Sequence, residues 1–167
     1  GLPPASEEVE TFVSAYHENA EAAIDSKVDQ LLSSERFGER WGRLWLDVAR
    51  YGESSGKEEN ATFPHAWRYR DYVIDSYNAD KPFNRFITEQ VAGDLLPAEN
   101  EAKAADQTVA TAFLAIGTKG LNEQNARQFR FDLVDEQIDT TTQAVLATTA
   151  ACARCHDHKF DPIPMSD

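Results

Sequence analysis

The sequence predicts an all-α fold, an irregular bundle of several helices joined by long loops. Apolar residues recur with the 3.6-residue period of an α-helix in most segments of the chain. The strict alternation of apolar and polar residues that is typical of a half-buried strand extends nowhere beyond a few residues. With 167 residues and no internal repeat, we expect residues 1–167 to form a single domain that buries its own core.

Three amphipathic segments fill the first third of the chain: residues 3–16, 22–34 and 35–51. We expect Ser6 and Ser34 to cap the first and third of these helices, because a serine hydroxyl accepts a hydrogen bond from a helix N-terminus. The third segment has the clearest helical period. We expect its apolar stripe to lie in the core: Phe37, Trp41, Leu44, Trp45, Val48 and Tyr51.

The middle of the chain alternates polar stretches with short helical segments. A polar loop over residues 52–64 precedes an aromatic helical segment at 65–78, and a short helix over 84–97 is predicted to end at Pro97. The acidic, alanine-rich residues 98–107 are expected to be exposed, and an apolar helix is predicted over 108–117.

The last long helix is predicted over residues 132–156, with Asp132 as its cap. The sequence therefore predicts that Cys152-Ala153-Arg154-Cys155-His156, a C-x-x-C-H motif, lies at the C-terminal end of a long helix.

The composition limits the classes of partner. Twenty-nine acidic side chains face 16 basic ones, so the formal net charge is −13. This balance argues against nucleic acid and anionic membrane surfaces as partners, and it permits a basic protein partner. No run of about 18 apolar residues occurs, so we expect no membrane insertion of this segment. The opening residues GLPPASEEVE show no signal peptide.

The C-x-x-C-H motif carries the clearest chemistry in the chain. Cys152 and Cys155 are its only cysteines, and His156 follows directly. This spacing is the attachment signature of c-type haem, in which two thiols add across the two vinyl groups of haem to form thioethers. The i, i+3 spacing puts both sulfurs on one side of a helical turn, and the histidine can then bind the iron as proximal ligand.

Two alternatives remain open for this motif. Cys152 and Cys155 can form a disulfide or stay a free dithiol without haem. A zinc site would want four ligands, which Cys152, Cys155, His156 and His158 could nominally supply, although ligands so close along one strand rarely enclose a tetrahedral ion.

Further haem contacts are predicted outside the motif. Arg68 and Arg70, beside aromatic residues, could pair with the haem propionates because arginine binds carboxylates with two hydrogen bonds, and surface salt bridges explain them equally well. His65 is a candidate metal ligand on the distal side of the iron. Met165 is the only methionine and would need a sharp loop to reach that face.

Three phrases of the sequence resemble the DUF1549 family, the planctomycete cytochrome c-associated domains also called PSCyt2. They are "ERFGERWGRLWLDVARY", "AWRYRDYVIDSYNADKPFNRFITEQVAGDLLP" and "CARCHDHKFDPIP". The resemblance implies a domain excised from a larger exported protein, and hence an extracytoplasmic location. It also implies neighbouring cytochrome c-like and DUF1553-type domains as partners.

These observations predict a c-type haem-binding electron-transfer module of a multidomain exported protein. Its cofactor is haem c, which can be absent from a protein made in an ordinary cytoplasm, because thioether formation needs a dedicated maturation system. Electrons would pass to or from the neighbouring domains or a redox protein.

The alternative is a non-redox scaffold or a carbohydrate- or protein-binding domain. An enzyme or sensor with an open haem site, such as a peroxidase, is a third possibility, which the absence of a strong distal ligand would favour.

Overall fold

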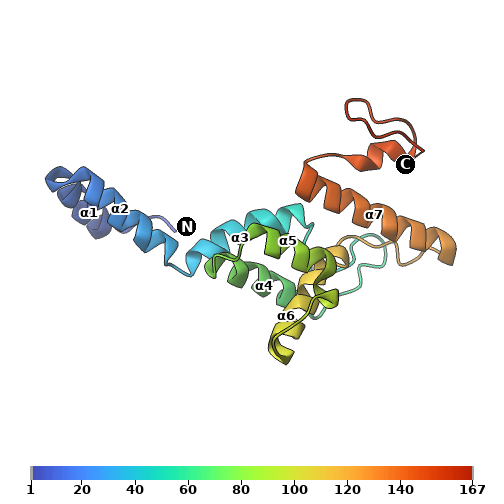
Figure 1. Cartoon of the computed structure of the whole chain (residues 1–167), viewed down its shortest axis with the longest axis horizontal. Helices are drawn as coiled ribbons and strands as arrows, with labels where there is room; N and C mark the ends of the chain where they lie inside the picture. Colours follow the sequence, from blue (N-terminus) through green and yellow to red (C-terminus); the bar gives the residue numbers. More distant parts are fainter. Residues whose placement is uncertain (1, 167) are drawn as a thin grey trace.

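A computed structural model describes residues 2–166 and confirms the all-α class. This part of the chain contains seven α-helices and three short 3₁₀-helices, and its only β-type pairing is an isolated bridge between Ser54 and Thr62. The first two helices project from one end of the molecule, four helices form its body, and the last helix lies at the other end with the C-terminal turn above it (Figure 1).

The projecting end is a helical hairpin of α1 (Ser6–Glu18) and α2 (Ala20–Leu32). Asn19 ends α1 and caps α2, where its side chain accepts a hydrogen bond from the Ala22 N–H at 3.1 Å. The prediction that Ser6 caps α1 is wrong: Ala5 takes that position, and the Glu8 carboxylate accepts from the Ala5 N–H at 2.9 Å. Only Ala23 of the hairpin is buried, so most of its apolar residues face outward.

Helices α3 (Arg36–Val48) and α4 (Trp67–Asn78) are the most closely packed pair. Gly38 makes the close approach possible, since a Cβ there would lie 2.4 Å from the Ile74 carbonyl oxygen. Its N–H donates to the Asn78 side chain at 2.7 Å. The Ser34 hydroxyl accepts from the Arg36 N–H at 3.3 Å, although Glu35 takes the cap position itself.

The core is an aromatic cluster around Trp45. Its ring packs against Phe86 at 4.9 Å and Phe113 at 5.8 Å between centroids, and its indole N–H donates to Gln90 Oε1 at 2.8 Å. The predicted core stripe of α3 is therefore only partly right. Trp45 is buried, while Trp41, Leu44 and Val48 remain nearly half exposed.

The segment after α5 (Phe83–Ala92) differs from the prediction. A 3₁₀-helix, η1 (Gly93–Leu95), leads into α6 (Glu101–Ala110) and then η2 (Thr111–Leu114). Residues 98–107 are largely exposed, as expected, but most of them form α6, and Gln107 is buried. Asn100 starts this helix by accepting from the Lys103 N–H at 2.8 Å, so the expected apolar helix at 108–117 begins earlier and ends sooner.

The long last helix also has different ends. Helix α7 spans Ala126–Leu146 and starts at Asn125, whose side chain accepts from two backbone N–H groups, so Asp132 is not its cap. It ends where Ala147 adopts a left-handed conformation with φ of 54°. The C-x-x-C-H motif therefore does not end the long helix. It begins in a separate 3₁₀-helix, η3 (Ala150–Arg154).

Among the residues that the structure describes, none of the helices combines the length and apolar character needed to cross a lipid bilayer.

Candidate functional site

The motif turn, residues 150–156, carries two free thiols three residues apart. Cys152 lies within η3 and Cys155 is the residue that ends it. A 3₁₀-helix has about three residues per turn, so side chains at i and i+3 eclipse one another. Both cysteines are exposed and neither forms a disulfide. The turn thus carries two free, exposed thiols at the i, i+3 spacing of the motif.

His156 is held so that one ring nitrogen stays available. Its Nδ1 lies 2.8 Å from the carbonyl oxygen of Asp157. A carbonyl oxygen only accepts hydrogen bonds, so Nδ1 carries the proton and Nε2 keeps its lone pair. Metal-binding histidines commonly donate their other ring N–H to a backbone carbonyl or a carboxylate, because this fixes the tautomer and the ring orientation. The side chain is also exposed, so a ligand can reach it.

Acidic residues of α7 hold the motif turn in place. The Arg154 guanidinium donates to Asp135 at 2.7 Å and to Asp132 at 3.1 Å. The Ala151 N–H points to Asp139 Oδ1 at 3.4 Å. Hydrogen bonds from Gln128 and Arg154 lower the pKa of the Asp132 carboxyl. The sequence analysis missed this anchor, although aspartates spaced three and four apart opposite an arginine in the motif are a readable signal.

His158 stabilises the loop that follows the motif. Its Nδ1 accepts from the Asp161 N–H at 2.8 Å, so the proton sits on Nε2, which lies 3.2 Å from the Thr149 hydroxyl. Both ring nitrogens are thus used within the loop. In the part of the chain that the structure describes, no three His, Cys, Asp or Glu side chains are grouped to hold a metal ion. The geometry therefore provides no set of ligands for the zinc alternative.

Met165 lies in the same C-terminal loop. Its N–H donates to Asp157 Oδ1 at 2.9 Å, and its side chain is exposed. Met165 as a distal ligand stays a prediction.

The remaining predicted haem contacts lie in the body of the molecule, at the start of α4 (Figure 1). Arg70 pairs with Asp71 at 2.9 Å and Glu53 at 3.7 Å, and Arg68 lies over the Trp67 ring at 5.4 Å from its centroid. His65 is exposed in the turn before α4. The structure gives these three residues no hydrogen bond or ion pair to the motif turn, and their contact with haem stays a prediction.

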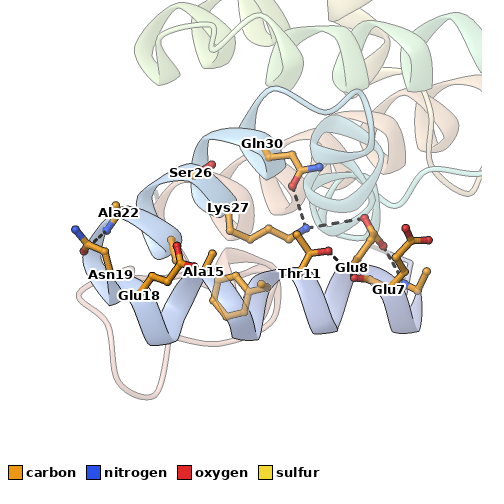
Figure 2. Close-up of a pocket in the computed structure, with 13 residues that line it drawn as sticks. Glu7, Glu8, Thr11, Ala15, Glu18, Asn19, Ala22, Ser26, Lys27 and Gln30 are labelled. Carbon is orange, nitrogen blue, oxygen red and sulfur yellow. Dashed lines mark hydrogen bonds and ion pairs between the residues drawn. The ribbon is translucent and has the colours of Figure 1, made fainter.

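A groove of about 550 Å³ runs along the hairpin of α1 and α2. Figure 2 shows Lys27 spanning it from α2, with its ammonium 2.9 Å from Gln30 Oε1 and 4.0 Å from Glu8 Oε1. The groove is lined by Phe12, Lys27 and small, polar and acidic side chains, and it contains neither cysteine nor histidine. It therefore offers no thiol or imidazole as a soft metal ligand.

A smaller hollow of about 340 Å³ lies beside the motif turn. Its lining consists of Arg154 and residues of α7: Gln128, Phe131, Val134, Asp135 and Ile138. Three of its six lining side chains are apolar, and Arg154, which lies between the two cysteines in the sequence, borders it.

Glu89 is the most strongly perturbed acid in the protein. It is fully buried and surrounded by Lys81 at 2.6 Å, Arg85 at 2.8 Å and Lys103 at 3.2 Å, with the Tyr72 hydroxyl donating at 2.9 Å. Burial opposes its ionisation, but the hydrogen bonds from Lys81, Arg85, Tyr72 and Lys103 outweigh burial and lower the pKa of Glu89 to about 2. Perturbed acids often mark active sites, yet Glu89 lines none of the hollows described above, so we assign it a structural role.

Comparison with known proteins identifies the family. A family model described as "PSCyt2: Protein of unknown function (DUF1549)" matches residues 1–167. The chain therefore belongs to the DUF1549 family, as the sequence resemblance predicted. No curated protein and no solved structure matches it significantly.

Proposed function

We propose that this member of the DUF1549 family is a c-type haem-binding electron-transfer module. Cys152 and Cys155 attach the haem and His156 is the proximal iron ligand. The observation that carries the proposal is the state of the motif turn. It carries two free, exposed cysteines three residues apart, followed directly by an imidazole whose Nδ1 faces the Asp157 carbonyl.

The covalent step uses only groups that the proposal names. Each cysteine thiol adds across one vinyl C=C bond of haem. A carbon–sulfur bond forms, the π bond is consumed, and the thiol proton ends on the terminal vinyl carbon. No leaving group and no oxidant are needed, and the free, exposed thiols suit this addition.

The Asp157 carbonyl orients the imidazole by accepting a hydrogen bond from Nδ1. A bound haem supplies one-electron redox chemistry, which the protein tunes through its axial ligands and the polarity around it. Because the motif turn is exposed, a haem attached there stays close to the surface, where a redox partner can approach. The proposed partners are a neighbouring cytochrome c-like domain, a DUF1553-type domain or a separate redox protein.

The test is an absorption spectrum of the domain after export and haem c maturation, recorded in denaturant. We expect a Soret band that stays with the unfolded polypeptide. The same band should be lost in Cys152→Ala/Cys155→Ala. In the folded protein, His156→Ala should alter the spectrum by removing the proximal ligand. A folded, colourless wild-type protein under these conditions would refute the proposal.

A second candidate function is a non-redox scaffold or a protein-binding domain. The α1–α2 hairpin favours it, because apolar side chains on both helices are about half exposed: Val9, Val13, Tyr16, Ile24, Val28 and Leu31. Exposed apolar patches of this kind often mark interaction surfaces. If the domain stays colourless after maturation, this second function would be the better supported of the two.

A further inference from the structure

Helix α7 uses two of its sides to contact the rest of the chain. One side faces the body: Thr140 is buried, Gln137 Nε2 donates to the Leu114 carbonyl at 3.1 Å, and Glu136 pairs with Arg50 at 3.3 Å. A second side, with Asp132, Asp135 and Asp139, binds the motif turn.

A third side of α7 carries apolar residues that the described chain leaves open. We call Phe131, Val134 and Ile138 the α7 stripe; their spacing of three and four places them on one helix face. Each is about half exposed. Two residues along a helix correspond to a rotation of about 200°, so Ile138 points away from the side on which Thr140 is buried. The body of the domain therefore cannot cover the stripe.

Arg154 connects the stripe to the proposed haem site. This residue lies between Cys152 and Cys155 in the sequence and lines the 340 Å³ hollow together with all three stripe residues. Its ion pairs with Asp132 and Asp135 fix the distance between the motif turn and α7. A group bonded to the two thiols is therefore attached one and two residues from the side chain that borders the stripe.

We propose that the α7 stripe is the surface on which the haem attached at Cys152 and Cys155 lies. This inference rests on the proposed function. The haem macrocycle is largely apolar, and its burial against Phe131, Val134 and Ile138 removes apolar area from water on both partners. The stripe thereby lowers the polarity around the iron, which raises the reduction potential relative to a fully hydrated haem.

Position and a smaller charge favour haem over other occupants, because haem brings only its two propionates to this acidic chain. A second copy of this chain would bring another net charge of −13 to the contact, and an anionic membrane would meet the same repulsion. Arg154 also borders a larger hollow of about 840 Å³ on α7, but charged side chains line it, including Lys57, Glu58 and Lys119. The smaller hollow, which Arg154 also lines, contains the apolar side chains of the α7 stripe. Apolar side chains suit the macrocycle better.

The experiment compares matured, exported wild-type domain with Val134→Asp/Ile138→Asp. Both positions are about half exposed, so the variant should fold. The matched control is Val28→Asp, the same change at a similarly exposed residue of α2. The readouts are circular dichroism in the Soret region and the reduction potential from an equilibrium titration. Thermal unfolding of the haem-free forms checks that all three proteins fold.

We expect the double variant to lose most of the Soret dichroism and to have a lower reduction potential, because two carboxylates beside the iron favour its oxidised form. The Val28→Asp control should match wild type. Unchanged dichroism and potential in a haem-loaded double variant would overturn the α7 stripe as the haem surface and leave covalent attachment intact. A colourless wild-type protein would overturn the proposed function and this inference together.

Discussion

The body of the molecule buries its central carboxylate, whereas the charged side chains that pair at the C-terminal end stay exposed. In the body, Glu89 is fully buried and compensated by three cations and a tyrosine hydroxyl. At the C-terminal end, Arg154 pairs with Asp132 and Asp135 while all three side chains stay between one third and one half exposed. Buried pairs are costly to break, whereas exposed pairs contribute little to stability. The fold thus depends on the body, and the proposed haem attachment lies where substitutions cost the fold little.

The group with the strongly shifted pKa and the groups that solvent can reach also lie in different parts of the molecule. The acid with the strongly lowered pKa, Glu89, has no solvent access, and the thiols of Cys152 and Cys155 are accessible but take no part in the core. The strongly lowered pKa of Glu89 therefore indicates structural importance. Four predictions test this division, from the largest expected effect to the smallest.

Glu89→Gln should cause the largest loss of stability. The substitution removes the anion and leaves Lys81, Arg85 and Lys103 without a counter-charge, which should cost about 3–5 kcal/mol in the free energy of unfolding. Urea titration measures this. The control is Glu39→Gln on α3, whose exposed pair with Arg36 should contribute less than about 1 kcal/mol. Equal effects of the two substitutions would contradict the division.

Acid should destabilise the protein through the same residue. The pKa of Glu89 is lowered from 4.5 to about 2 in the folded state, so the unfolded chain binds the proton more tightly. The stabilisation is present above pH 4.5 and is lost as the pH falls toward 2, by about 3 kcal/mol in total. Unfolding free energies across this range should fall more steeply for wild type than for Glu89→Gln. Parallel curves would show that another group controls acid unfolding.

Gly38→Ala should destabilise the contact between α3 and α4. Alanine is the better helix former, but its Cβ would lie 2.4 Å from the Ile74 carbonyl oxygen, so the helices must move apart. We expect a loss of about 1–3 kcal/mol in thermal or urea unfolding. Gly52→Ala is the control, because the nearest atom there, the Ser54 carbonyl oxygen, is 3.6 Å away. A neutral Gly38→Ala would mean that the two helices are packed less tightly than described.

Arg154→Ala should change the unfolding free energy least, by less than about 1 kcal/mol, because its ion pairs are exposed. It should nevertheless release the motif turn from α7. Hydrogen exchange by mass spectrometry should speed up in peptides covering residues 147–158 and stay unchanged in α3 to α5. Arg36→Ala, which removes another exposed ion pair, should leave residues 147–158 as they are. Unchanged exchange in Arg154→Ala would show that the aspartates of α7 do not hold the turn.

The sequence predicted helices well where the period was strong and failed where long-range contacts decide. The apolar period from Phe37 to Tyr51 correctly predicted helix α3. A period alone could not show that Trp41 and Leu44 stay exposed. The end of α7 depends on the left-handed Ala147. The loop after η3 is tied back by the contact between Thr149 and His158, which joins residues nine positions apart.

The residues of the candidate site could be predicted from the sequence, but the contacts that hold them in place could not. The spacing of Cys152, Cys155 and His156 is a local signal and identifies the motif directly. The hydrogen bond from His156 to the Asp157 carbonyl and the packing of Arg154 on α7 depend on three-dimensional placement. The cluster around Glu89 gave only the local signal of its i, i+4 pair with Arg85, because Lys103 and Tyr72 come from other helices.

The most direct test of the central claim is peptide mapping by mass spectrometry of the domain after export and haem c maturation. The account predicts one haem bonded to the peptide that contains Cys152 and Cys155, with no haem on any other peptide. It also predicts that the haem-free form keeps the same helical content, because the body folds without the motif turn. An intact, folded protein whose Cys152–Cys155 peptide carries two unmodified thiols or a disulfide would contradict the account.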